Sequence, residues 1–326
     1  ILGDILMSSG IISYLGAFTK TYREEIVLDW AKKIQRANLP ISFGPGKSPN
    51  NIMRSIIGDD MEIEQWKSQK LPNDNFSADN ALIMSQSRRF CLLIDPQNQA
   101  LTWLKEKIRV ETEEKKSKTE KNKRSSYDDG SKKLERRRDG GTGAHYTIKP
   151  TMDAKLMTDI TLDCCRYGKQ LIFENAGEVL PTCIAPIYKK EFITQGNITQ
   201  VNINATQCEV HPDFRFYIIT QLPKPHYLPD ICVALTIVNF TVTEEGLQDQ
   251  MLNFLVEKDD PSLNAQRKTC IDTRNSSNRE KKEIETQILL LLQESKEKAT
   301  EDNTILDNTA LIEKLRQSNL SSNANP

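Results

Sequence analysis

The sequence lacks the patterns by which metal sites and disulfide frameworks are recognised. Its three histidines, His145, His211 and His226, lie far apart, and no two cysteines have the Cys-x-x-Cys spacing typical of zinc sites. The cysteine count is seven, an odd number that does not fit a complete set of disulfides. We therefore expect reduced thiols, as in a cytosolic-type compartment, and no bound metal.

A long hydrophobic run is also missing. No window holds the roughly 18 consecutive apolar residues that a membrane-spanning helix requires, so we expect no membrane span. The chain starts with Ile1-Leu2-Gly3-Asp4, without an initiator methionine or a basic region ahead of an apolar stretch. This start does not resemble a signal peptide, and it leads us to interpret the chain as a fragment of a longer protein.

Neither sign of charge is in excess. The 44 lysines and arginines and the 45 aspartates and glutamates give a formal net charge of -1. Overall charge therefore gives no reason to expect nucleic acid or a membrane surface as a partner. Hydrophobic residues make up 37% of the 326 residues, so part of the chain is expected to be solvated, and the length suggests about two domains.

Strand-like and helix-like segments alternate along the middle of the chain. Residues 3–36 have helical periodicity, with Gly10 and Gly16 as weak points, and a helix is also expected at 151–167. Four short apolar runs predict β-strands: Phe90–Ile94, Leu171–Phe173, Phe214–Thr220 and Ile231–Phe240. The alternation predicts an α/β fold of three layers around a largely parallel sheet.

Two later segments have their own character. Residues 105–140 hold 14 basic and 9 acidic residues with little to bury, which predicts a disordered or weakly helical insertion at about 105–144. A basic patch for an acidic protein surface or RNA is the alternative interpretation. From residue 261 two charged amphipathic helices joined by a polar turn predict an antiparallel hairpin. Its seam is expected at Ile284, Ile288, Leu291, Ile305, Leu311 and Leu315.

The residues after the first strand do not suit a phosphate. A nucleotide-binding loop there needs glycines, whose backbone N–H groups surround the phosphates, and a lysine that neutralises their charge. The chain instead reads Asp95, Pro96, Gln97, Asn98, Gln99 and Ala100. Asp95 would repel a phosphate, and Pro96 removes a backbone donor. We therefore expect no nucleotide cofactor at this position.

The other candidate groups are interpreted as structural. Glu174-Asn175 ends the second strand with one acid where a magnesium-binding pair is usual, so a polar strand end is favoured. Cys164-Cys165 is interpreted as two buried thiols. His226 lies in a proline-rich loop that it is expected to shape. For Arg88-Arg89 a surface ion pair is favoured over contact with a neighbouring anion.

Several segments resemble dynein heavy chains. The resemblance is carried by Gly3–Phe18, Leu71–Ser77, Ser87–Ala100, Phe214–Thr220, Pro225–Pro229 and Val238–Gln250. It covers about residues 1–104 and 145–320. The Pro-His-Tyr-Leu-Pro and Gly-Leu-Gln-Asp-Gln sequences resemble the axonemal type. The family usually has Gly where Asn98 stands and often Trp at Phe90, and the charged insertion is unusual for it.

The resemblance implies a place in a motor built as a ring of six AAA+ modules. Residues 1–66 would be a helical link after the stalk, 67–260 a degenerate fifth AAA+ module, and 261–326 a buttress coiled-coil hairpin. Thr220 would occupy the sensor position. The module would hold no cofactor and catalyse nothing, while other modules of the parent ATPase bind ATP and magnesium.

The implied partners are the neighbouring AAA+ modules and the stalk coiled coil, and, through the parent chain, microtubules and dynein light and intermediate chains. The implied location is the cytoskeleton of the cytoplasm, in the axoneme of a cilium or flagellum. Two alternatives stay open. One is a divergent NTPase that holds nucleotide through backbone contacts alone, and the other is a free-standing interaction or scaffold protein.

Overall fold

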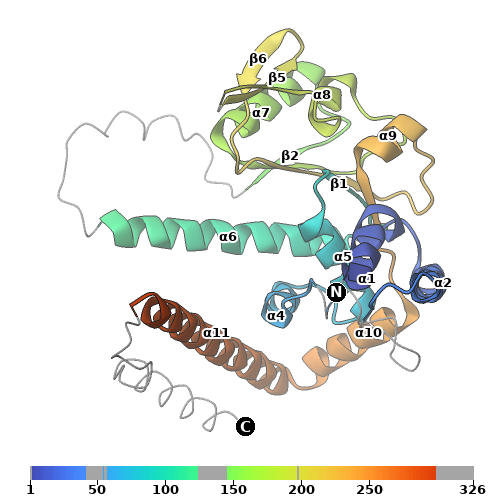
Figure 1. Cartoon of the computed structure of the whole chain (residues 1–326). Helices are drawn as coiled ribbons and strands as arrows, with labels where there is room; N and C mark the ends of the chain where they lie inside the picture. The colour runs from blue at the N-terminus through green and yellow to red at the C-terminus, as the bar shows by residue number, and fades with distance from the viewer. Residues whose placement is uncertain (1, 42–53, 55–56, 124–144, 197, 299–326) are drawn as a thin grey trace. The chain divides into compact units, whose positions relative to one another are not determined.

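A computed structural model describes residues 2–41, 54, 57–123, 145–196 and 198–298 (Figure 1). The chain divides into two compact units. The first unit is formed by Ile1–Gly58 and Gln69–Gln250, and the second by Asp59–Ser68 and Met251–Pro326.

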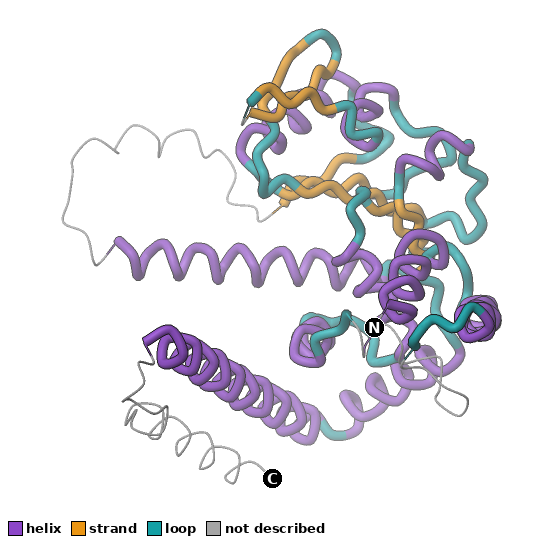
Figure 2. Tube along the Cα trace, viewed as in Figure 1, coloured by secondary structure: helices purple, strands orange, loops and turns teal. Residues whose placement is uncertain are grey.

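A parallel five-stranded sheet forms the centre of the first unit (Figure 2). Its strands lie in the order β2-β3-β7-β1-β8, and every neighbouring pair is parallel. Leu93 aligns with Ile219 on one side and with Val238 on the other. The strands are β1 (Cys91–Ile94), β2 (His145–Ile148), β3 (Gln170–Phe173), β7 (Arg215–Thr220) and β8 (Thr236–Asn239). The parallel α/β sheet predicted from the sequence is confirmed.

Helices cover the sheet because its side chains are apolar on both faces. Trp103, Leu104 and Ile108 are fully or almost fully buried on one helix, and the ring of Trp103 lies 6.1 Å from that of Phe240. The α-helices of this unit between residues 75 and 234 are α5 (Asn75–Gln86), α6 (Gln99–Lys123), α7 (Ala154–Tyr167), α8 (Ala185–Tyr188) and α9 (Pro229–Ala234). A 3-10 turn, Thr182–Ile184, precedes α8.

The fourth apolar run was assigned incorrectly from the sequence. Residues 231–240 were expected to form one strand, but the first part belongs to α9 and only Thr236–Asn239 form β8. Pro229 starts the helix because proline at the first helical position lacks only an N–H that would be unpaired anyway. Apolar content alone does not separate a short buried helix from a strand.

A three-stranded antiparallel sheet lies between β3 and β7 in the chain and was not predicted. It consists of β4 (Phe192–Gln195), β5 (Ile198–Ile203) and β6 (Thr206–Glu209), in that order. These strands are largely polar, so no apolar run marks them. Asn204 and Ala205 have φ values of 48° and 64°, as a two-residue hairpin turn requires. Val201, Ile203 and Cys208 pack into the core beside α7.

The N-terminal helices attach to the edge strand β8 through a glycine. Helix α1 (Leu2–Gly10) continues as a π-helical turn, Ile11–Leu15, and α2 (Lys20–Arg36) follows. The carbonyl of Gly16 accepts the backbone N–H of Asn239 at 2.8 Å. It also accepts the Nη2 of buried Arg23 at 2.7 Å, whose guanidinium lies 4.4 Å from the ring centre of Phe76. Gly16, predicted as a weak point of the helical segment, is therefore the residue at which this segment closely approaches β8.

Asp79 on α5 is a titrating carboxyl group close to Arg54 and Arg23. Burial raises the pKa of Asp79 to about 7, although Arg54 and Arg23 act in the opposite direction; Arg54 Nε lies 3.7 Å from Asp79 Oδ1. The native state therefore keeps a proton on Asp79 at pH values where the unfolded chain, with an ordinary aspartate pKa near 4, has lost it. Stability contributed by this group is present at low pH and is lost as the pH rises towards 7.

We expect Asp79→Asn to remove this pH dependence. In the wild-type chain the free energy of unfolding should gain about 1–2 kcal/mol from Asp79 between pH 7 and pH 5, a value reduced for partial solvent screening. Urea unfolding at the two pH values measures the difference. Asp29→Asn is the control, because Asp29 is exposed and its ion pair is with Lys33 on the same helix. Equal pH slopes in the wild type and Asp79→Asn would contradict the prediction.

Helix α6 is longer than the charge pattern indicated. It continues to Lys123, past residue 105, where the charged insertion was expected to begin. Ile108 is buried, and Glu111 accepts a hydrogen bond from Gln170 Nε2 at 3.1 Å. The early part of the charged stretch is therefore helical and contacts the sheet, because Ile108 continues the buried face formed by Trp103 and Leu104. The remainder, 124–144, lies outside the described residues.

The described part of the second unit, 59–68 and 251–298, is mostly helical. Helix α4 (Asp60–Ser68) packs against α11 (Pro261–Lys298), and α10 (Glu244–Asp259) spans the division between the units. On α11 Ile284 and Ile288 are half-buried, whereas Leu289 and Leu290 are exposed. The side chain of Leu291 and the seam residues Ile305, Leu311 and Leu315 lie outside the described residues. Within the part of the chain that is described, no helix is both long and apolar enough to cross a membrane.

All seven cysteines are free thiols. Cys91, Cys164, Cys165, Cys183 and Cys208 are buried, while Cys232 and Cys270 are exposed. Burial raises the pKa of Cys91 and of Cys164 to about 12, and it also raises the pKa of Cys165. The interpretation of Cys164-Cys165 as buried thiols is confirmed.

Candidate nucleotide site and its occupation by Asp95

The position where a nucleotide would bind lies at the carboxyl edge of the parallel sheet. In open α/β sheets ligands occupy the crevice outside the carboxyl ends of the strands. Here β1 ends at Ile94 and α6 begins at Gln99, so the first N–H groups of α6 face this edge. Unpaired N–H groups and the partial positive charge of a helix N-terminus attract anions.

The carboxylate of Asp95 occupies this N-terminus. Its Oδ1 accepts the backbone N–H of Gln99 at 2.8 Å, and its Oδ2 accepts the N–H of Leu101 at 2.9 Å. The residue is 0% exposed. Burial raises the pKa of Asp95, while the surrounding backbone N–H donors lower it. The side chain thus uses the donors that would otherwise be available to a phosphate, and its charge repels one.

The turn between β1 and α6 is closed by side-chain amides. Asn98 has a φ of 59°, which Asn tolerates better than most residues and which Gly adopts freely. Its Oδ1 accepts Nε2 of Gln221 at 2.9 Å, and Oε1 of Gln99 accepts Nε2 of Gln250 at 2.7 Å. Gln221, which follows β7, and Gln250 of α10 therefore hold a loop that lacks the glycines of a phosphate cradle.

The acidic strand end is paired with lysines. Oε1 of Glu174 lies 2.6 Å from Nζ of Lys105 on α6, and Oε2 lies 3.8 Å from Nζ of Lys149. The Glu174 side chain is only 12% exposed. Asn175 follows with a φ of 54°, so the chain turns sharply after the strand. This arrangement fits the predicted polar strand end, in which the acid has a protein partner.

Thr220, which the family resemblance would place at the sensor position, is also engaged in the protein's own hydrogen bonds. Thr220 is fully buried, and its hydroxyl donates to the carbonyl of Ala176 at 2.7 Å. Its carbonyl accepts the N–H of Asp95 at 2.8 Å, which joins the ends of β1 and β7. The structure therefore brings Asp95, Glu174 and Thr220 to one edge, as the sequence indicated.

The sequence did not indicate the partners of these residues. Lys105, Lys149 and Gln250 are far from Glu174 and Gln99 in the chain, and Lys105 was assigned to the charged insertion. No motif marks them, and only the helical phase of Leu104 and Ile108 would have placed Lys105 on a helix beside the sheet.

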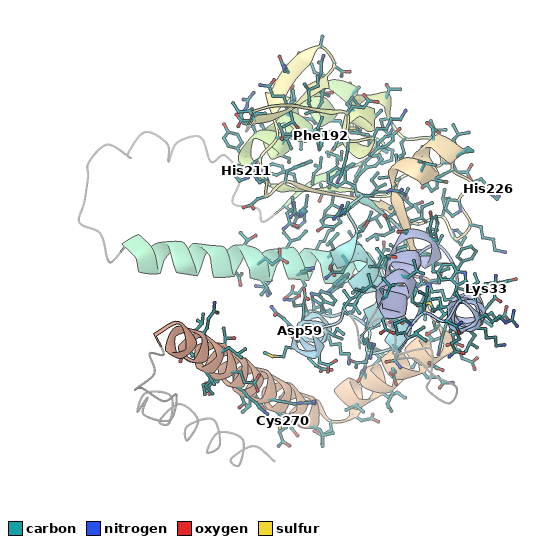
Figure 3. All side chains as sticks on the ribbon, viewed as in Figure 1. Lys33, Asp59, Phe192, His211, His226 and Cys270 are labelled. Atoms are coloured by element: carbon teal, nitrogen blue, oxygen red, sulfur yellow. The ribbon has the colours of Figure 1, made fainter. Side chains whose placement is uncertain are left out.

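A metal centre finds no support in the described residues, where no group of three or more His, Cys, Asp or Glu side chains is arranged to hold an ion. Figure 3 shows His211 and His226 well apart within the first unit. His226 contributes its backbone N–H to Oε1 of Glu178 at 3.0 Å, which fits a residue that shapes a loop.

The parallel sheet with helices on both faces, and the helix that begins after the first strand, define an α/β module of the AAA+ type. A family model described as the ATP-binding dynein motor region matches residues 64–324, which is most of the chain. The chain therefore belongs to the dynein motor family.

Individual relatives agree with this assignment. The chain is 32% identical over 324 residues to dynein axonemal heavy chain 6 of Homo sapiens, and 31% identical over 302 residues to dynein axonemal heavy chain 1 of the same species. It is 28% identical over 321 residues to dynein axonemal heavy chain 2 of Mus musculus. These alignments cover 99%, 93% and 98% of the chain but only 7%, 6% and 6% of the relatives.

Proposed function

We propose that the chain is a non-catalytic ring module of an axonemal dynein heavy chain, together with the buttress that follows it. Residues 1–66 would link the stalk to the module, 67–260 would be the degenerate fifth AAA+ module, and 261–326 the buttress hairpin. The module would relay ATP-driven motion of the ring to the stalk during microtubule-based ciliary movement. Its partners would be the neighbouring modules, the stalk and, through the parent chain, microtubules and smaller dynein chains.

The observation that carries this proposal is the position of Asp95. A fully buried carboxylate accepts two N–H groups of the helix that would cradle a phosphate. A phosphate could reach these N–H groups only by displacing the Asp95 carboxylate, which would then lose its hydrogen bonds. The turn also has no lysine to neutralise the charge of the phosphate. A module that binds no nucleotide can still act mechanically. Its tightly packed elements shift between discrete arrangements and can therefore transmit a displacement.

Nucleotide binding tests the proposal directly. We expect the β1–α6 turn to contribute no ATP binding. In isothermal titration calorimetry of the 326-residue chain with ATP and Mg²⁺, replacing Gln99 by proline should therefore leave any measured affinity unchanged. The description of the family as ATP-binding favours the rival, a divergent NTPase module. Micromolar affinity that is lost when Gln99 is replaced by proline, with the fold intact by circular dichroism, would support that rival and overturn the non-catalytic assignment.

The relay role is tested in a complete heavy chain. Ile288 is half-buried on α11 and belongs to the expected seam with Leu291, whereas the adjacent Leu289 is 66% exposed. We expect Ile288→Asp to remove most of the microtubule-stimulated increase in ATPase rate without changing ATP affinity, because a charge in the seam separates packed helices. Leu289→Asp is the matched control. Normal coupling between ATPase and microtubule affinity in Ile288→Asp would refute the relay.

A further inference from the structure

A cavity lies at the opposite edge of the parallel sheet, where the strands begin. Its volume is about 490 Å³, within the range of roughly 300–1,000 Å³ of small-molecule sites. Cys91 starts β1, Gln170 starts β3 and Arg215 starts β7, and all three line the cavity. The cavity is thus at the end of β1 remote from Asp95, and it lies entirely within the first unit.

Positive charge dominates the lining. The charged residues are Arg88, Arg89, Lys107, Lys190, Arg215 and Glu111. Five cations and one carboxylate leave a formal excess of four positive charges. The carboxylate is already engaged, since Glu111 accepts Nε2 of Gln170 at 3.1 Å and lies 4.0 Å from Nζ of Lys107. The cations come from separate segments that the fold brings together, so the excess is invisible in the balanced overall charge.

The arginines of the cavity have no acidic partner in the described part of the chain. Ion pairs there within 4.0 Å do not include Arg88, Arg89 or Arg215. The surface ion pair favoured for Arg88-Arg89 from the sequence is therefore absent among these residues. Guanidinium groups bind phosphate oxygens through parallel N–H bonds, which makes unpaired arginines around a cavity suitable for a phosphate.

Two of the cations are held in place by uncharged groups. Nζ of Lys190 donates to the carbonyl of Arg88 and lies 4.7 Å from the ring centre of Phe90. Nη1 of Arg215 donates to the carbonyls of Pro212 and Phe214, each at 3.0 Å. Burial and the charge of Arg215 lower the pKa of Lys190. Lys190 and Arg215 are therefore held at the cavity although their charges repel each other. A bound anion would reduce this repulsion.

We propose that this cavity binds a phosphate-bearing small molecule that carries several negative charges. The excess of four positive charges matches a polyphosphate better than a single phosphate, and the volume admits a compact ligand. The site is separate from the turn occupied by Asp95, and the inference does not depend on whether that turn binds nucleotide.

Binding of inorganic tripolyphosphate to the 326-residue chain, measured by calorimetry, tests this site. We expect saturable binding that weakens as salt is added, because exposed charges are screened. The double variant Arg89→Gln, Arg215→Gln should weaken binding at least about tenfold. Lys20→Gln, Lys33→Gln is the control with the same loss of charge on α2, and it should bind like the wild type.

A gain of affinity provides a readout that misfolding cannot imitate. Glu111→Gln removes the only carboxylate among the described lining residues of the cavity and should tighten binding about threefold. A tetraglutamate peptide of similar charge should bind more weakly than tripolyphosphate if the arginines recognise phosphate geometry. The proposal is overturned by an absence of binding at millimolar tripolyphosphate, by equal weakening in both double variants, by unchanged affinity in Glu111→Gln, or by equal binding of the peptide.

Discussion

Asp95→Ala should destabilise the chain by about 3 kcal/mol. The substitution leaves the N–H groups of Gln99 and Leu101 unpaired in a buried position, and each buried unpaired donor costs about 1–3 kcal/mol. It also removes a negative charge from the N-terminus of α6. Urea unfolding of the 326-residue chain measures the loss. Asp95→Asn keeps one acceptor oxygen and should lose about half as much.

Asp153→Ala is the matched control for this substitution. Asp153 also precedes a helix, α7, but it is exposed and its side chain makes no capping hydrogen bond. Its replacement should leave the free energy of unfolding nearly unchanged. If Asp95→Ala were as mild as Asp153→Ala, the carboxylate could not be the group that satisfies the first turn of α6, and the case for a closed phosphate position would fail.

Gly16→Ala should cost the chain about 3 kcal/mol or more. A Cβ atom at this position would lie 2.4 Å from the carbonyl oxygen of Ile237, and backbone cannot move aside as the end of a flexible side chain can. Relief of the clash must displace the segment from β8, which breaks the hydrogen bond from Asn239 to Gly16. Urea unfolding, with hydrogen exchange of the Asn239 amide, measures both effects.

Gly177→Ala provides the comparison. Nothing lies within 4 Å of a Cβ at Gly177, so the same chemical change should be nearly neutral there. Equal stability of the two variants would mean that the N-terminal helices are not held to β8 through Gly16. A protected Asn239 amide in Gly16→Ala would lead to the same conclusion.

The central sheet could be predicted from the sequence because its strands are short apolar runs with helical segments between them. The runs ending at Ile94, Phe173 and Thr220 are buried on both faces, so burial itself produced the signal. The small antiparallel sheet could not be predicted in this way. Its strands bury only alternate residues such as Val201 and Ile203, and its turn at Asn204-Ala205 lacks the usual glycine.

The candidate site was predictable in its residue types but not in its bonds. The acidic, glycine-free turn at Asp95 already indicated a poor phosphate site. That the carboxylate itself caps α6 depends on atomic positions beyond the reach of spacing rules, as do the lysine partners of Glu174 and the cluster of arginines at the other edge. The Asp95 bonds are local and depend on the exact geometry of the turn. The lysine partners of Glu174 and the arginine cluster come from separate segments that meet only in the finished sheet.

The distribution of the thiols has a practical consequence for spectroscopy. Thiolates, not thiols, attack maleimides, so the five buried cysteines should be unreactive in the folded chain. A dye or spin label added to the native protein should attach at Cys232 on α9 and at Cys270 on α11. These two natural attachment points belong to different units, so the unmodified sequence already carries a labelling pair that reports changes in the distance between the two units.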